Sequence, residues 1–234
     1  MGSLHDVRFP CESEAYRSAR DELLEAEVAL RRQIEEVAAL RGRLPPGGEV
    51  STDYEFEEWA SADDAKRRVR LSELFAPGKD TLLIYSFMIV PPEQGLPFEG
   101  PCPSCTSIID AIDGAMPHIT QRMNFAVCAK APIERFREHA RSRGWRHARL
   151  LSSAPSSYNL DYLAEDEHGG QWPLATVFVR RDGKIHHHWS SELWLAPRED
   201  GQESRHVDFM WPMWAIFDRS PEGRGDFFPA LEYS

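Results

Sequence analysis

The sequence predicts an α/β protein with a central mixed sheet and a long N-terminal helical arm. Two apolar runs, 81–90 and 123–129, read as buried strands, and segments with helical periodicity follow each of them. Asp182-Gly183 joins two further β-rich runs and is a strong hairpin signal. Strands that alternate with helices indicate a parallel sheet, to which the hairpin adds an antiparallel edge.

The arm is predicted from residues 12–43, which contain no proline and have their only glycine at the end. Their apolar stripe repeats every seven residues at Leu23, Leu30, Val37 and Leu44. "LPPGG" at 44–48 ends the helix. The stripe spans only about three heptads, so the helix either packs on its own domain or pairs with a second copy. We expect a homodimer through this helix, and we divide the chain into an arm at 1–50 and a domain at 51–234.

The domain begins with a polar stretch, 51–80, that predicts a loop and a short amphipathic segment. After the strand at 81–90, the remaining elements follow in an order that fits a three-layer α/β fold: a helix from Pro103, a strand at 123–129, a helix at 132–145, a short strand at 148–153, a loop, a hairpin at 175–190 and a closing helix at 206–218.

The composition of the chain argues against nucleic-acid binding and membrane association. The 234 residues carry a net charge of −11, which argues against a nucleic-acid or anionic-membrane surface. The longest apolar run is shorter than the roughly 20 residues that span a bilayer, and the first residues lack the apolar core of a signal peptide. We therefore expect a cytoplasmic protein without membrane contact. In that compartment thiols stay reduced, so the four cysteines are not expected to form a disulfide framework.

Cys102 and Cys105 form a C-x-x-C pair where the first buried strand gives way to a helix, which is typical of a thioredoxin-like fold. Pro103 suits the first helical position. The unpaired N–H groups and the dipole of the helix would stabilise a thiolate on Cys102. We expect Cys102 to be an exposed nucleophile, Cys105 to be the resolving thiol, and Pro103 and Ser104 to tune the pair. The partner would be a thiol or disulfide substrate or a redox protein, and no cofactor is required.

Several motifs carry a family resemblance from about residue 16 to residue 233: "YRSARDELLEAEVALRRQIEEVAALRGRLPPGGEV", "GPCPSCTSIIDAIDG", "FVRRDGKIHHHWSS" and "FDRSPEGRGD". In these motifs the chain resembles the thioredoxin-like proteins catalogued as domain-of-unknown-function family 899. Those proteins are generally described as predicted dithiol-disulfide oxidoreductases. The resemblance implies a thioredoxin-like fold and dithiol chemistry.

The chain also departs from related enzymes. Thioredoxin-like enzymes usually place a cis-proline opposite the cysteines. In this chain that place falls near Ala175-Thr176, and Pro173 comes two residues too early to fill it. Thr176 is therefore the candidate for a residue that supports the cysteine pair from this position. "GLPFEGPC" lacks the Pro and Thr pattern of a peroxiredoxin, which disfavours a peroxidase of that type. Cys128, at the end of the second buried strand, either faces the pair as a third thiol or packs in the core.

The run His186-His187-His188 offers an alternative site. On a strand, His186 and His188 face one way, and His187 faces the other way with Ile185 and Trp189. His187 is a supporting candidate, and a histidine could act as general base for the nucleophile. Alternatively, His186 and His188 join the cysteine pair to bind copper or zinc. A third reading is a non-catalytic scaffold that dimerises through its arm.

Overall fold

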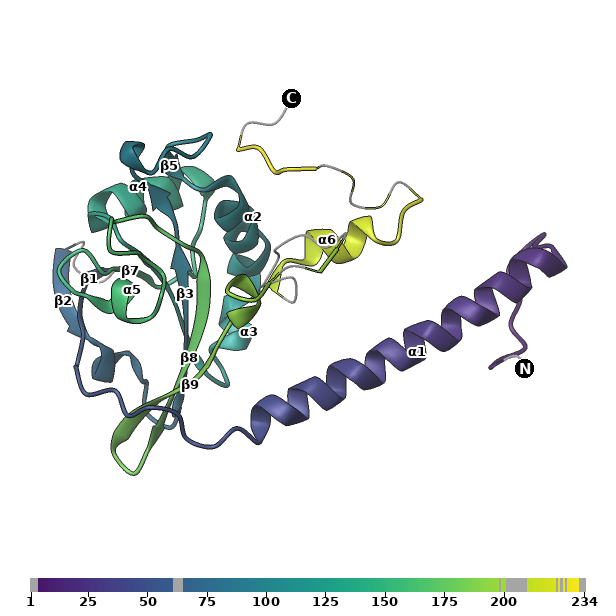
Figure 1. Cartoon of the computed structure of the whole chain (residues 1–234), viewed down its shortest axis with the longest axis horizontal. Coiled ribbons are helices and arrows are strands. Elements are labelled where there is room, and N and C mark those ends of the chain that lie inside the picture. The colour runs from purple at the N-terminus through teal and green to yellow at the C-terminus, as the bar shows by residue number, and fades with distance from the viewer. Residues whose placement is uncertain are drawn as a thin grey trace. The chain divides into compact units, whose positions relative to one another are not determined.

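A seven-stranded mixed sheet, in the order β2-β1-β7-β6-β3-β8-β9, forms the centre of the larger unit in the part of the chain that is described. The computed structural model describes residues 4–60, 65–197, 199–200, 210–221, 223, 225 and 227–231 (Figure 1). The strands of this sheet are β1 (Glu55–Ala60), β2 (Ala65–Arg70), β3 (Thr81–Phe87), β6 (Asn124–Ala129), β7 (Leu150–Ser152), β8 (Leu174–Arg181) and β9 (Lys184–Ser190).

A second, two-stranded sheet, six α-helices and four short 3-10 helices complete the described elements. The 3-10 helices are η1 (Leu71–Leu74), η2 (Pro92–Gln94), η3 (Asp113–Ala115) and η4 (Glu192–Trp194). The small sheet pairs β4 (Ile89–Val90) with β5 (Gly100–Pro101). The α-helices are α1 (Glu14–Gly42), α2 (Pro103–Ile112), α3 (Met116–Ile119), α4 (Ile133–Arg143), α5 (Tyr158–Asp161) and α6 (Pro212–Phe217). The chain divides into two compact units, Met1–Pro45 and Pro46–Ser234.

The strand pairing confirms the predicted thioredoxin-like α/β class. β3 runs parallel to β6 and antiparallel to β8, and β9 extends the sheet as the second strand of the hairpin. The connections β3-α2-β6 and β6-α4-β7 step in the same direction along the sheet. Because such crossovers are right-handed, both helices fall on one face. Ile108 of α2 and Phe136 of α4 accordingly join Tyr85 and Phe87 of β3 in one buried cluster.

The other face of the sheet has its own core. Ile84, Ala126 and Phe178 project there, because side chains alternate along a strand, and Tyr158 of α5 covers them. The fold therefore has three layers: α2, α3, α4 and α6 on the first face, the sheet, and α5 on the second face. We call the side of the sheet that packs against α2 the α2 face and the other side the α5 face.

The prediction of a loop and a short amphipathic segment over 51–80 missed the two strands β1 and β2, which pair antiparallel. Acidic residues of β1 lie opposite basic residues of β2, as in Glu57 opposite Arg68 and Glu58 opposite Arg67. Glu58 is buried and also accepts a hydrogen bond from Arg149, with Nε 2.8 Å from Oε2. These charges hide the apolar alternation that would have indicated strands.

The arm is the predicted helix. Ser13 caps α1, since its side chain accepts a hydrogen bond from the N–H of Tyr16 at 3.2 Å. Among the described helices, none combines the length and the hydrophobicity that crossing a bilayer requires. Residues 206–209 of the predicted closing helix lie outside the described residues. The rest of that prediction corresponds to α6, which begins at Pro212.

Candidate dithiol site

The start of α2 is held by backbone hydrogen bonds on both sides of Cys102, its N-cap residue. The Cys102 N–H donates to the carbonyl of Met88 at 3.0 Å, where the chain leaves β3. The Cys102 carbonyl accepts from the N–H of Thr106 at 2.9 Å and so makes the first bond of the helix. Pro103 is the first helical residue, where its missing N–H costs nothing. The C-x-x-C segment is therefore fixed to the end of the central strand.

Cys102 is more buried than the sequence indicated. Only 5% of the residue is exposed, and it belongs to the same buried cluster as Met88, Trp211 and Trp214. The expectation of an exposed nucleophile is therefore wrong. The physical reason is that the start of α2 packs into the buried cluster on the α2 face, to which the aromatic segment at 210–217 also belongs.

The surroundings of Cys102 favour its thiolate in spite of this burial. The side chain makes no capping hydrogen bond of ordinary geometry. The Cys105 thiol is the largest influence that lowers the pKa of Cys102, followed by the backbone N–H of Cys105 and then by the backbone N–H and side chain of Ser104. Burial opposes these effects, and the net shift is downward. Of these contacts, the two backbone N–H groups are the donors that a helix start supplies.

Cys105 behaves in the opposite way. The residue is 1% exposed, and burial is the largest cause that raises its pKa well above the ordinary thiol value, followed by the neighbouring Cys102. Two hydrogen-bond donors lower the pKa of Cys105 in part: the Tyr85 hydroxyl, 3.3 Å from Cys105 Sγ, and the backbone N–H of Met88. Both thiols are free. The pair thus combines one thiol poised to ionise with one that keeps its proton.

Sequence reasoning missed Tyr85, which looked like one more apolar residue of the central strand. Its side chain shares the α2 face with Phe87, and it is fully buried. A buried tyrosine usually finds a partner for its hydroxyl, so a tyrosine inside an otherwise apolar strand was a usable signal. Here that partner is the sulfur of Cys105.

His139 of α4 is a second residue that the sequence did not single out. Its Nε2 lies 3.0 Å from the hydroxyl of Thr106, which also donates to the Cys102 carbonyl at 2.8 Å. Burial, aided by the charge of Arg143, lowers the pKa of His139 to about 4. A neutral imidazole therefore links α4 to the first turn of α2.

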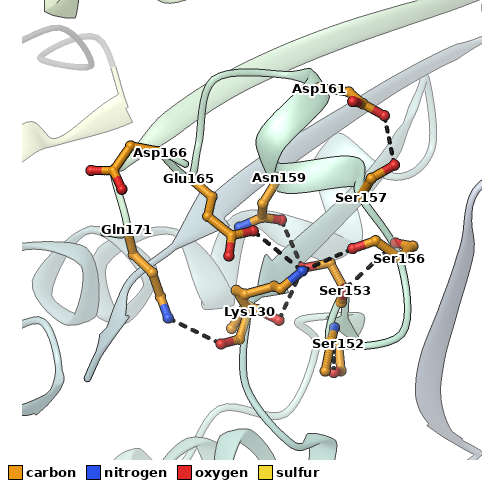
Figure 2. A network of polar contacts seen from close by, with 12 residues as sticks. Lys130, Ser152, Ser153, Ser156, Ser157, Asn159, Asp161, Glu165, Asp166 and Gln171 are labelled. Atoms are coloured by element: carbon orange, nitrogen blue, oxygen red, sulfur yellow. Dashed lines mark hydrogen bonds and ion pairs between the residues drawn. The ribbon is translucent and has the colours of Figure 1, made fainter. Parts of the chain in front are cut away.

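A polar network supports the chain next to the site (Figure 2). The side chain of Gln171 accepts from the N–H of Ile89 at 2.9 Å and donates to the carbonyl of Lys130 at 3.0 Å. The Lys130 ammonium donates to the carbonyl of Ser156 at 2.9 Å and pairs with Glu165 at 3.2 Å. Because Ile89 follows Met88, this network holds the backbone that bonds Cys102.

Cys128 does not face the pair. It lies on the α5 face with Ile84 and Ala126, whereas Cys102 and Cys105 lie on the α2 face. Its position in β6 sends the side chain to the opposite side of the sheet from Val127 and Ala129. Burial raises the pKa of Cys128 to about 12, so this thiol stays protonated. The expectation of a third thiol at the pair is wrong, and the packing alternative describes Cys128.

Thr176 and His187 also lie on the α5 face. The Thr176 hydroxyl accepts from Ser190 at 3.2 Å, and His187 Nε2 lies 2.9 Å from the same Ser190 oxygen. The His187 ring packs against Tyr162 and Phe178, and burial lowers its pKa. Neither residue supports the cysteine pair, which corrects both predictions.

A β-bulge explains why Trp189 lies on a different face of the sheet from the one that the sequence predicted. The β8–β9 register shifts so that Val177 pairs with Trp189 and Phe178 pairs with His187. His188 is the extra residue, and it reverses the alternation of β9. Trp189 therefore packs on the α2 face, not on the face of His187 where the alternation predicted it.

The alternative metal set is not brought together. Within the described ranges, no three histidine, cysteine, aspartate or glutamate side chains form a group that could hold a metal ion. His186 instead lies with Nδ1 3.3 Å from the carbonyl of Gly47. His188 is the bulge residue of β9. The cysteine pair thus lacks the two histidines that copper or zinc binding required.

Fold and site together define a thioredoxin-like α/β protein with two unlike free thiols at a helix start. The family described as "Bacterial protein of unknown function (DUF899)" matches the chain over residues 7–232, and the chain belongs to this family, which confirms the resemblance drawn from the motifs. No curated protein matches the sequence.

Several solved structures are similar at low identity. Reduced 2-Cys peroxiredoxin of Plasmodium vivax is 17% identical, over 73% of this chain and 95% of that chain, with a TM-score of 0.45. Peroxidoxin BcpB of Mycobacterium tuberculosis is 16% identical, over 72% and 95%, with a TM-score of 0.43. A peroxiredoxin-like protein of Aquifex aeolicus is 12% identical, over 63% and 75%, with a TM-score of 0.40.

Proposed function

We propose that this protein is a thiol-disulfide oxidoreductase in which Cys102 attacks and Cys105 resolves. The observation that carries the proposal is the geometry of the pair: Cys102 is the N-cap residue of α2, and Cys105, buried in the first turn, accepts a hydrogen bond from Tyr85 at 3.3 Å. In line with this placement, the pKa is lowered for Cys102 and raised for Cys105. A nucleophile has to be ionised before it reacts, and a resolving thiol has to wait for the mixed disulfide.

The reaction proceeds in two exchanges. The Cys102 thiolate attacks one sulfur of a substrate disulfide, which forms a mixed disulfide and releases the other sulfur as a thiolate. Cys105 then loses its proton and attacks the Cys102 sulfur. This second exchange forms the Cys102–Cys105 disulfide and releases the second substrate thiolate, and both leaving thiolates take up protons. The substrate gains two electrons and the protein loses two, so an external dithiol has to restore the protein.

Tyr85 supports the second exchange. Its hydroxyl donates to Cys105 Sγ, and such a donor stabilises the thiolate that Cys105 becomes when it attacks. Since only 5% of Cys102 is exposed, an incoming disulfide requires the side chains around it to move apart.

Substitution of each cysteine tests the proposal. Reduction of hydroxyethyl disulfide, with dithiothreitol as reductant, should be lost in Cys102→Ser. Cys105→Ser should accumulate a mixed disulfide that mass spectrometry detects. Because the pKa of Cys102 is lowered, its alkylation by iodoacetamide should reach half its maximal rate below the ordinary thiol value of about 8.5.

Cys11→Ser is the matched control, because Cys11 is an exposed cysteine in the other unit. It should leave disulfide reduction unchanged. Full activity in a folded Cys102→Ser variant would contradict the proposal. Absence of activity in the wild type would also contradict it, and would leave the non-catalytic scaffold as the better description.

A further inference from the structure

One side of the helix α1 presents apolar side chains that nothing in the arm covers. Leu23, Leu30, Ile34 and Leu40 are 46–60% exposed. Successive helical residues are about 100° apart, which places these four side chains and Val37 within an arc of about 120°. Scattered exposed leucines are ordinary on a protein surface, but a continuous stripe along a helix is typical of an interface.

The other side of α1 already has its partner within the arm. Arg17 is buried and pairs with Glu12 at 3.5 Å and with Asp21 at 3.0 Å. The guanidinium of Arg20 lies over the ring of Phe9, with its carbon 5.9 Å from the ring centroid. These contacts hold the segment that precedes the helix against the side roughly opposite the apolar stripe. Within the arm, these contacts at residues 17–21 leave the apolar stripe uncovered.

The charges of the helix are divided between its two halves. Residues 14–28 contain five acidic residues and two arginines, whereas residues 29–43 contain four arginines and two acidic residues. A single helix gains from acidic residues in its first turn and basic residues in its last turn, but that effect falls off within one turn. Here the division reaches the middle of the helix, with Glu25 and Glu27 on one side of it and Arg31 and Arg32 on the other.

We propose that two copies of this chain associate through their α1 helices in antiparallel orientation. Antiparallel pairing places the acidic half of each helix beside the basic half of the other, whereas parallel pairing would place like halves together. In the register that matches the stripes, Leu23 lies level with Leu40 of the second copy. The interface is independent of the thiol chemistry.

Oligomeric state tests the interface. Analytical ultracentrifugation of the full chain should give a dimer, and Leu30→Glu should give a monomer because it puts a carboxylate in the middle of the apolar seam. Glutamate forms helix well, so far-ultraviolet circular dichroism should confirm that the variant is folded. Leu193→Glu is the control, because Leu193 is an equally exposed leucine in the other unit, and it should remain a dimer. A monomeric wild type, a dimeric Leu30→Glu variant or a monomeric Leu193→Glu variant would each overturn the proposal.

Orientation is tested by a spin-label distance. Ser18 is exposed on α1, and Ser18→Cys is made in a background of Cys11→Ser, Cys102→Ser and Cys105→Ser. Antiparallel pairing in the stated register separates the two labels by about 27 residues along the axis, or about 40 Å. Parallel pairing would leave them within about 20 Å of each other. A dimer with the short distance would overturn the antiparallel arrangement.

Discussion

At the scale of single residues, two successive hydrogen bonds connect Tyr85 to Cys105 and Cys105 to Cys102. Tyr85 donates to Cys105 at 3.3 Å, and the Cys105 thiol is the largest influence that lowers the pKa of Cys102. Hydrogen bonds in such a chain polarise one another, so the donation by Tyr85 makes Cys105 a better donor to the Cys102 thiolate. A buried residue of the central strand thereby acts on Cys102 through Cys105.

Tyr85→Phe should therefore raise the pKa of Cys102. Loss of one hydrogen bond of about 1 kcal/mol corresponds to at most about 0.7 pKa units. The pH dependence of Cys102 alkylation measures this shift. The mixed disulfide should also persist several-fold longer during turnover, because the Cys105 thiolate loses a donor.

Tyr158→Phe serves as the control for this substitution. Tyr158 is another fully buried tyrosine, but it lies on the α5 face, away from the pair. Its replacement should leave the alkylation profile unchanged. Equal profiles for wild type and Tyr85→Phe would rule out a positioning role for Tyr85.

At the scale of secondary-structure elements, Asp113 connects α2 to the segment between α4 and β7. Its carboxylate, just beyond α2, accepts the backbone N–H groups of Arg146 at 3.0 Å, His147 at 3.0 Å and Ala148 at 2.9 Å. These residues connect the end of α4 to β7. One buried side chain thus joins the far end of α2 to the next crossover of the sheet.

Asp113→Ala should lower the free energy of unfolding by about 2–4 kcal/mol, because three N–H groups lose their acceptor together. Urea denaturation measures the loss. Asp80→Ala is the comparison, because Asp80 is an exposed aspartate whose side chain pairs with Arg180 at 3.0 Å, and it should cost less than about 1 kcal/mol. Similar losses in the two variants would show that Asp113 has no special anchoring role.

The whole molecule consists of two units that should unfold separately. All seven tryptophans lie between residues 59 and 214, so tryptophan fluorescence reports only on the unit Pro46–Ser234. Circular dichroism also reports on α1. An isolated helix of this length is marginally stable in water, since most helical stability comes from packing.

In the Leu30→Glu variant, circular dichroism should show loss of helix at a lower temperature than the fluorescence transition. In the wild type, the temperature of that helix loss should rise with protein concentration, because association stabilises the arm by mass action. Coincident transitions at every concentration would instead indicate that the arm unfolds with the domain.

Local patterns in the sequence were sufficient to predict the arm, the order of most strands and helices, and the C-x-x-C segment before a helix. Each of these depends on neighbours within one or two turns or along one strand, so periodicity and turn residues reveal them. The sequence did not predict the hairpin of β1 and β2, because its charged residues look like a polar loop when read along the chain. In the structure these residues form ion pairs across the two strands: Glu55 with Arg68, Glu57 with Lys66 and Glu58 with Arg67.

Only the tertiary structure decided what surrounds the thiols. Cys128 looked close to the pair because the carboxyl ends of parallel strands share one edge, but strand alternation sends its side chain to the other face. The bulge at His188 moved Trp189 away from the face of His187, and Tyr85 met Cys105 across 20 residues of chain. Sequence determines which groups a short segment carries. Which of them meet is decided by the packing of distant segments, and here that packing places the hydroxyl of Tyr85, and not the predicted His187 or Cys128, beside the cysteine pair.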